Sequence, residues 1–261
     1  MRALSIGATG MMAQQLNVEV ISNNIANMST TGYKRQRAEF QDLLYQQERH
    51  VGSPTSDTGT ILPSGVQVGL GVKTAAISRD DEQGALAKTD NRLDVALQGP
   101  GFFNVQLPNG DTAYTRAGSF QLAADGTIVT ADGYPVQPAI VIPANAKDVV
   151  ISTAGEVFAY FDGQVQPQNL GQLELSTFIN DNGLEAEGNN LFKETTASGA
   201  PTVGVAGQTG FGTILQGYLE GSNVNVVSEI TNLIQAQRAY EMNSKSIETA
   251  DQMLQTITQL R

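Results

Sequence analysis

Residues 226–260 read VVSEITNLIQAQRAYEMNSKSIETADQMLQTITQL, a stretch without proline in which apolar residues recur every seven positions. The repeating residues are Val226, Leu233, Tyr240, Ile247 and Leu254. This spacing is typical of a helix that packs along a second helix as a coiled coil. Asn225 precedes the repeat and is a candidate N-cap. We therefore predict one long C-terminal helix.

The N-terminal stretch carries a matching pattern. Leu4, Met11, Val18 and Ile25 also recur every seven positions, and no proline lies between residues 3 and 25. The chain between the two ends reads as strands and turns, so neither helix has an obvious partner except the other. We predict that the two terminal helices pair as a coiled coil. A helix pair that caps a β core is the alternative.

The middle of the chain has the signals of β structure. Short alternating runs extend from Val66 to about Gly221, and Asp-Gly pairs at 125–126 and 132–133 separate them. Asp-Gly favours a hairpin, because glycine accepts the positive φ of a tight turn. We predict an α+β fold in three parts. These are a terminal coiled-coil domain (1–28 with 222–261), a connecting segment or arm (29–66 with about 205–221) and a central, mainly antiparallel β domain (67–204).

Composition excludes several classes of function. The formal net charge is −11, whereas a nucleic-acid-binding surface needs a basic patch. The chain has no cysteine, which excludes disulfides and thiolate metal sites, and its single histidine, His50, cannot build a zinc site. Its glycine-rich stretches do not match the spacing of glycines, lysine and hydroxyl residue in a phosphate-binding loop. We therefore predict a protein that is not an enzyme and that holds no cofactor and no metal.

The distribution of apolar residues indicates whether the chain could span a membrane or carry a signal peptide. The chain has no apolar run that approaches the ~20 residues needed to span a bilayer. Its N-terminus also lacks the apolar core and the small-residue cleavage site of a signal peptide. These rules alone predict a cytoplasmic protein without membrane insertion. The family resemblance described below replaces the expectation of a cytoplasmic location.

The end of the predicted N-terminal helix carries a recognisable motif. Ser22-Asn-Asn-Ile-Ala-Asn27, followed by Ser29-Thr-Thr-Gly-Tyr-Lys-Arg35, resembles the motif that closes this helix in the rod and hook proteins of the bacterial flagellum. Asn27 and the hydroxyl residues after it can end a helix, and Gly32 permits a turn that a side chain would block.

Further motifs extend the resemblance over the whole chain, in the order expected for this family. The C-terminal motif is similar at residues 216–226 and 237–245, and the body motif at 97–103 and 114–120. Three other segments resemble the distal-rod members of the family; they are residues 40–45, 62–66 and 136–145.

The resemblance implies a structural subunit of the distal rod. Copies would assemble into a hollow helical drive shaft that transmits torque from motor to hook across the periplasm and outer membrane. The implied partners are other copies, the proximal rod and hook proteins, the flagellar ring proteins around the rod, and the type III export apparatus. The implied location is the basal body, reached without a cleaved signal peptide. A proximal rod or hook subunit is one alternative; an extracellular β-rich adhesin is another, from a different class.

The residues expected at subunit interfaces come from the two heptad rows, the N-terminal motif and the connector 51–66. We expect this polar connector to lie along an adjacent subunit and to stiffen the rod, with a passive surface loop as the alternative. The full set is Leu4, Met11, Val18, Asn24, Ile25, Asn27, Gly32, Tyr33, Gly52, Gly65, Val226, Leu233, Tyr240, Ile247 and Leu254.

Overall fold

The computed structural model describes residues 2–49, 64–163 and 166–259. The chain forms two compact units, each assembled from separate stretches of sequence. The helical unit comprises Met1–Ile25, Gln36–Ser78 and Asn225–Arg261. The β unit comprises Ala26–Arg35 and Arg79–Val224. The predicted α+β class, with a helix at each end of the chain and an antiparallel β core between them, is confirmed.

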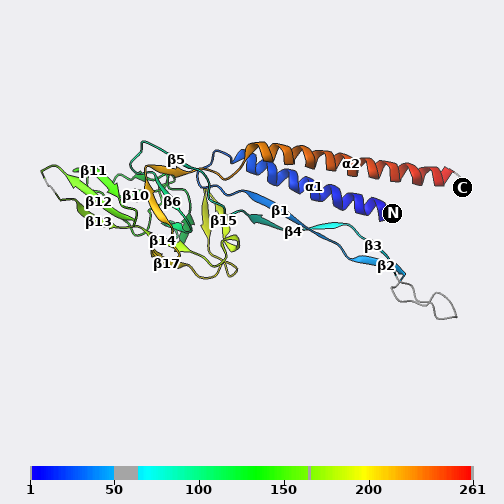
Figure 1. Cartoon of the computed structure of the whole chain (residues 1–261), viewed down its shortest axis with the longest axis horizontal. Helices are drawn as coiled ribbons and strands as arrows, with labels where there is room; N and C mark the ends of the chain where they lie inside the picture. Colours follow the sequence, from blue (N-terminus) through cyan, green and yellow to red (C-terminus); the bar gives the residue numbers. More distant parts are fainter. Residues whose placement is uncertain (1, 50–63, 164–165, 260–261) are drawn as a thin grey trace. The chain divides into compact units, whose positions relative to one another are not determined.

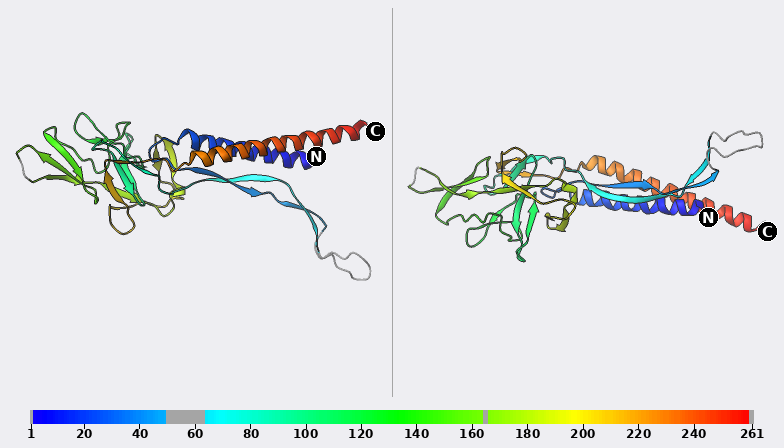
Figure 2. Two further views of the ribbon diagram at one scale, coloured as in Figure 1. Left: turned by 45° about the horizontal axis from the view of Figure 1, so that its top comes forward. Right: turned by 90° about the horizontal axis from the view of Figure 1, so that it is seen from below.

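Two long antiparallel helices dominate the helical unit. Helix α1 spans Arg2–Ala26 and α2 spans Val226–Gln259, and they lie side by side in all three views (Figures 1 and 2). A Cβ built on Gly7 of α1 would lie 2.8 Å from Cγ1 of Ile247 in α2. Glycine at position 7 therefore allows the close approach of the two helices. At the other end of the pair, Asn24 Nδ2 donates to Glu229 Oε2 at 3.2 Å.

The N-cap predicted for α2 is confirmed. The side-chain oxygen of Asn225 accepts from the backbone N–H groups of Val227, at 3.1 Å, and Ser228, at 3.3 Å. These two donors have no partner within the helix, so the cap stabilises its first turn. Glu229 also lies in that turn, where its negative charge interacts favourably with the positive end of the helix dipole.

A long β ribbon completes the helical unit (Figure 1). Strand β1 (Gln36–Asp42) pairs with β4 (Val72–Arg79), and β2 (Tyr45–Arg49) pairs antiparallel with β3 (Val66–Gly69). Gly71, with φ +124°, lies against Thr9 of α1, whose hydroxyl accepts from Val72 N–H at 3.4 Å.

The ribbon differs from the layout predicted from the sequence. We assigned residues from 67 onward to the central β domain, yet 67–78 pair with the strands before the connector and belong to the helical unit. Alternation identified these strands correctly but does not specify their partners. Gly52 and most of the predicted connector 51–66 lie outside the described residues, which leave out 50–63.

The β unit is built from short strands, and its described pairings are antiparallel. Its largest sheet has six strands in the order β15-β16-β8-β7-β14-β17, and β11-β12-β13 form a second sheet. Three strand pairs complete it: β18-β6, β19-β5 and β10-β9. The bounds are β5 Leu86–Lys88, β6 Val95–Gln98, β7 Phe102–Gln106, β8 Thr112–Thr115, β9 Gln121–Leu122, β10 Ile128–Val129, β11 Ala146–Ile151, β12 Glu156–Phe161, β13 Gln168–Gln172, β14 Glu174–Thr177, η1 (a 3-10 helix) Asp181–Gly183, β15 Glu185–Gly188, β16 Leu191–Lys193, β17 Thr202–Val205, β18 Thr213–Gln216 and β19 Tyr218–Glu220.

One hydrophobic core holds these strands together. Phe103 and Phe120 meet edge to face at its centre, with ring centroids 5.1 Å apart. Gly126 and Gly133 adopt the positive φ expected of the two Asp-Gly turns, at +82° and +87°. The other buried core residues are Val95, Leu97, Ile128, Val136, Ile140, Ile142, Ile151, Val157, Leu173, Leu175, Ala206 and Ile214.

Candidate assembly sites

The chain passes between the two units four times, at 25–26, 35–36, 78–79 and 224–225. The parts of the β unit next to these crossings converge on one buried carboxylate, Glu220 at the end of β19. Glu220 is only 1% exposed. Its Oε1 accepts from Lys34 Nζ at 2.7 Å, and its Oε2 accepts from Arg116 Nε at 2.7 Å. The three motifs on which the resemblance rests therefore meet at a single buried charge cluster.

The cations of this cluster also donate to backbone oxygens. Arg116 also donates to the backbone oxygens of Gly101 and Gly99, both at 2.6 Å, which fixes the turn between β6 and β7. Lys34 donates to Glu82 O at 2.8 Å. A buried charge is costly unless it is paired and hydrogen-bonded, so this arrangement explains how three charged groups are tolerated inside the β unit.

Burial and ion pairing shift the pKa values of Glu220 and Lys34 in opposite directions. Burial raises the pKa of Glu220, but the charges and hydrogen bonds of Arg116 and Lys34 outweigh it, so this pKa lies below its ordinary value. For Lys34, burial has the larger effect and lowers the pKa, although Glu220 opposes it. The ionised form of Glu220 therefore stabilises the folded β unit.

Gly32 brings the N-terminal motif onto the cluster. Its φ is +69°, and its N–H donates to Glu220 O at 2.8 Å. A Cβ on Gly32 would lie 2.9 Å from the carbonyl carbon of Arg116. Asn27 accepts from the N–H and the hydroxyl of Thr30, which turns the chain after α1, and Tyr33 is half-buried beside this turn. The turn expected at Gly32 is confirmed, and no other residue fits there without displacing backbone.

Replacing Gly32 with alanine should lower the free energy of unfolding by about 2–4 kcal/mol, because strain at positive φ adds to the clash with Arg116. Gly110→Ala is the control, since Gly110 also has a positive φ, +90°, but open space around it. That change should cost only about 1 kcal/mol. Denaturant unfolding of the full chain measures both. Equal losses for the two variants would show that the contact with Arg116 is unimportant.

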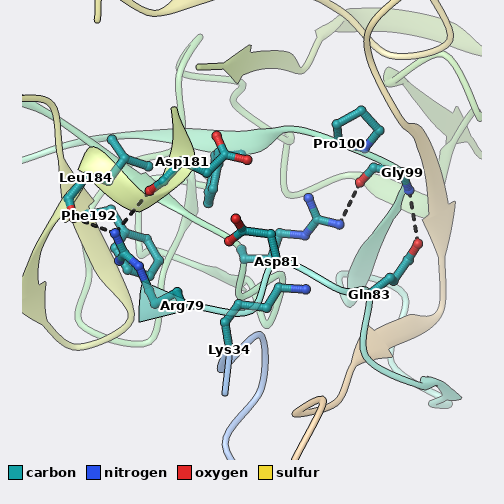
Figure 3. Close-up of a pocket in the computed structure, with 11 residues that line it drawn as sticks. Lys34, Arg79, Asp81, Gln83, Gly99, Pro100, Asp181, Leu184 and Phe192 are labelled. Atoms are coloured by element: carbon teal, nitrogen blue, oxygen red, sulfur yellow. Dashed lines mark hydrogen bonds between the residues drawn. The ribbon is translucent and has the colours of Figure 1, made fainter. Parts of the chain in front are cut away.

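A cavity of about 320 Å³ lies beside the cluster, within the β unit (Figure 3). Arg79 enters it, donates to the backbone oxygens of Asp181 and Leu184, and stacks 4.6 Å from the centre of the Phe192 ring. Asp81 and Asp181 line the same cavity, and burial raises the pKa of each carboxyl. Lys34, Arg79 and Arg116, the cationic residues that line the cavity, bind carboxylate and carbonyl oxygens of the same chain. This is the pattern of a structural ion network.

The helical unit contains a second buried polar site. Asn24 is almost wholly buried; its Nδ2 donates to Gln36 O at 2.8 Å and to Glu229 Oε2, and its Oδ1 accepts from Gln36 N at 2.9 Å. Asn24 thus joins α1, α2 and the start of β1 within one chain. Polar groups buried between helices fix their register.

The predicted heptad rows lie beside the line of closest packing. Tyr240 and Leu254 are 43% and 38% exposed, and the other seven residues of the two rows are half-buried. The fully buried positions of α2 lie three residues after members of its row, at Glu229, Ala236 and Ala250. Gly65, at the start of the ribbon's second limb, is half-buried too. In the single chain, the apolar rows therefore keep much of their surface free.

Helix α2 also carries an outward apolar set that sequence reasoning did not select. Val227 and Met242 are 75% and 66% exposed, and Ile230, Ile234 and Met253 are exposed as well. Exposed apolar surface of this extent on one helix marks an interaction site. None of the helices in the described ranges is long and apolar enough to cross a lipid bilayer.

Three protein-family models match the chain. They are described as "Flagella basal body rod protein" (residues 4–34), "Flagellar hook protein FlgE/F/G D1 domain" (96–159) and "Flagellar basal body rod FlgEFG protein C-terminal" (215–260). Each model contributes one charged residue of the Glu220 cluster. The matches and the fold together define an axial protein of the bacterial flagellum, of the rod and hook class.

Comparison with individual proteins indicates which kind of rod or hook protein the chain is. The chain is 61% identical to the flagellar basal-body rod protein FlgG of Caulobacter vibrioides over 261 residues, all of both chains. It is 54% identical to FlgG of Agrobacterium fabrum over 258 residues, 99% of this chain and 98% of that one. The flagellar hook-basal body complex protein FlhP of Bacillus subtilis is 32% identical over 273 residues, all of both chains. The chain therefore belongs to the flagellar basal-body rod protein family. It is a structural subunit of the distal rod, rather than of the proximal rod or hook.

Proposed function

We propose that copies of this chain assemble into a hollow helical shaft through the helical unit and that the shaft transmits torque. The observation that carries the proposal is the apolar surface left exposed on α2. A helix with apolar residues on more than one side needs more than one neighbour, and α1 supplies only one. Neighbouring copies of the same unit would bury the remainder.

The terminal helices would form coiled coils in this assembly. The row Leu4, Met11, Val18 and Ile25 would face helices of adjacent copies, as would the α2 row that includes Leu233. Ile247 of that row packs on Gly7 of α1 in the same chain. Seven-residue repeats of apolar side chains support such packing. We further propose three radial layers: terminal helices inside, a connecting layer of residues 29–66 with about 205–221, and the β domain outside. Residues 67–78 join the connecting layer, because they pair with strands that precede the connector.

The partners and location follow from family membership. We propose contacts with copies of the chain, with proximal rod and hook proteins, with ring proteins around the rod and with the type III export apparatus. The location would be the basal body between periplasm and outer membrane, reached without a cleaved signal peptide. The role would be mechanical, not catalytic, because the named relatives are rod proteins.

Electron microscopy of the concentrated full chain tests the proposal. We expect filaments or tubes with a central channel, because apolar helix faces associate as concentration rises. We still predict that the connector 51–66 contacts a neighbouring copy. The experiment therefore uses the full chain, with this connector included. Particles that remain monomeric at every concentration, with both helices folded, would contradict assembly through α2.

A further inference from the structure

Three residues of the β unit, each close to a different crossing between the units, form a closed ring of hydrogen bonds. Arg35 ends the first stretch of the β unit, Asp80 lies two residues after the 78–79 crossing, and Asn223 lies two residues before Asn225. Asn223 Oδ1 accepts from Arg35 N at 2.7 Å, Arg35 O accepts from Asp80 N at 2.8 Å, and Asn223 Nδ2 donates to Asp80 O at 2.9 Å. Three of the four crossing strands are thus tied to one another.

Other contacts strengthen the ring. Asn223 Nδ2 also donates to Glu82 O at 2.9 Å, and the side chains of Arg35 and Asp80 are 3.9 Å apart as an ion pair. Glu220, three residues before Asn223, anchors the same strands through Lys34 and through the N–H of Gly84 at 3.1 Å. The ring is therefore attached to the most buried charge of the β unit.

The chemistry of the ring requires an amide side chain at position 223. Asparagine presents an acceptor and two donors on one short group. Here the acceptor holds one crossing strand and the donors hold another. Aspartate would keep the acceptor but lose the donors, and alanine would lose both.

The mechanical consequence follows from backbone freedom. Each residue of an untied strand has two soft dihedral angles, so separate crossing strands can swivel independently. Hydrogen bonds between the strands remove that freedom close to the point where each strand leaves the β unit. A twisting force on the β unit then reaches all three tied strands at once.

We propose that Asn223 is a positioning residue for torque transmission, because it ties three crossing strands of the β unit into one block. This inference rests on the proposed torque-transmitting role of the chain. Asn223 lies in the C-terminal motif at 216–226, but the motif alone does not indicate this role. Neither the 35–36 nor the 78–79 crossing is near it in sequence.

Amide hydrogen exchange on the full-length monomer tests the tie itself. Asn223→Ala should make the Asp80 amide exchange about tenfold faster, although that amide bonds to Arg35 O and not to Asn223. The core amide of Val95, bonded to Gly118 O, should stay as protected as in the wild type. Asn223→Asp should leave the Arg35 amide protected while Asp80 exchanges faster.

The control is Asn109→Ala, which removes an asparagine whose side chain bonds to Asp111 in an exposed turn. It should leave the Asp80 amide unchanged. Unchanged exchange at Asp80 in both Asn223 variants would overturn the tie.

Flagellar rotation under load tests the mechanical role. Cells whose distal rod is built from Asn223→Ala should assemble rods, yet their rotation should fall more steeply with medium viscosity than in cells with the wild-type chain or Asn109→Ala. Faster exchange at Asp80 with an unchanged response to viscosity would overturn the mechanical role. If the wild-type chain built no rod in these cells, the proposed function would fail instead, while the exchange result would stand separately.

Discussion

Replacing Ile247 with aspartate should prevent assembly of the chain while the β unit remains folded. Ile247 lies against Gly7 of α1 and belongs to the apolar row of α2. A carboxylate there would lose hydration where it packs against Gly7, at a cost of about 3 kcal/mol in the packed helices. The effect should be large in the assembly, because every copy would contribute the same defect.

Sedimentation and electron microscopy measure this effect, with thermal unfolding of the β unit measured alongside. Ile247→Val is the matched control, since it keeps an apolar, β-branched side chain at the same position. The control should assemble like the wild type. Assembly of Ile247→Asp at wild-type concentrations would show that the packing of α2 on α1 at Gly7 is not needed for the subunit contact.

Replacing Glu220 with glutamine should give the largest loss of stability in the β unit. Lys34 and Arg116 would keep their charges with side chains only 10% and 8% exposed, and without the carboxylate that compensates them. Breaking a buried ion pair from one side costs about 3–5 kcal/mol. We expect a loss of this size in the free energy of unfolding of the full chain at neutral pH.

Glu187→Gln is the matched control, because Glu187 pairs with Lys193 at 3.9 Å on the surface of the same unit. Its cost should be at most about 0.5 kcal/mol. If Glu220→Gln cost no more than this control, the cluster would not hold the crossing strands together.

The pH dependence of this difference gives a second check. The folded pKa of Glu220 is below the ordinary value of 4.5, so its contribution is present above that value and is lost as pH falls through the folded pKa. The gap in stability between the wild type and Glu220→Gln should therefore shrink below about pH 4.5. A gap that widens in acid would contradict the assigned role of the carboxylate.

Local chemistry explains which elements were predictable from the sequence. Both helices, the Asn225 cap and the two Asp-Gly turns depend on residues within a few positions of each other. The heptad repeat also indicated which side of α2 is apolar. It did not separate the half-buried row from the small buried residues Ala236 and Ala250, because both follow the same seven-residue period.

Long-range pairing was the part that the sequence could not supply. Lys34, Arg116 and Glu220 are 82 and 104 residues apart along the chain, and each reads by itself as an ordinary surface charge. The pairing of β4 with β1 was equally hard to predict, because an alternating pattern identifies a strand but does not say which strand it pairs with. A family motif indicated that these residues matter, while the bonds to Glu220 and Asn223 show the physical reason.

The central claim is that this rod subunit assembles through its terminal helices. Image reconstruction of tubes formed by the full-length chain tests it most directly. We expect α1 and α2 of every copy to line the central channel, with Val227, Ile230 and Ile234 buried against helices of neighbouring copies. A reconstruction in which these side chains face solvent, and the β unit alone makes the contacts between copies, would contradict it.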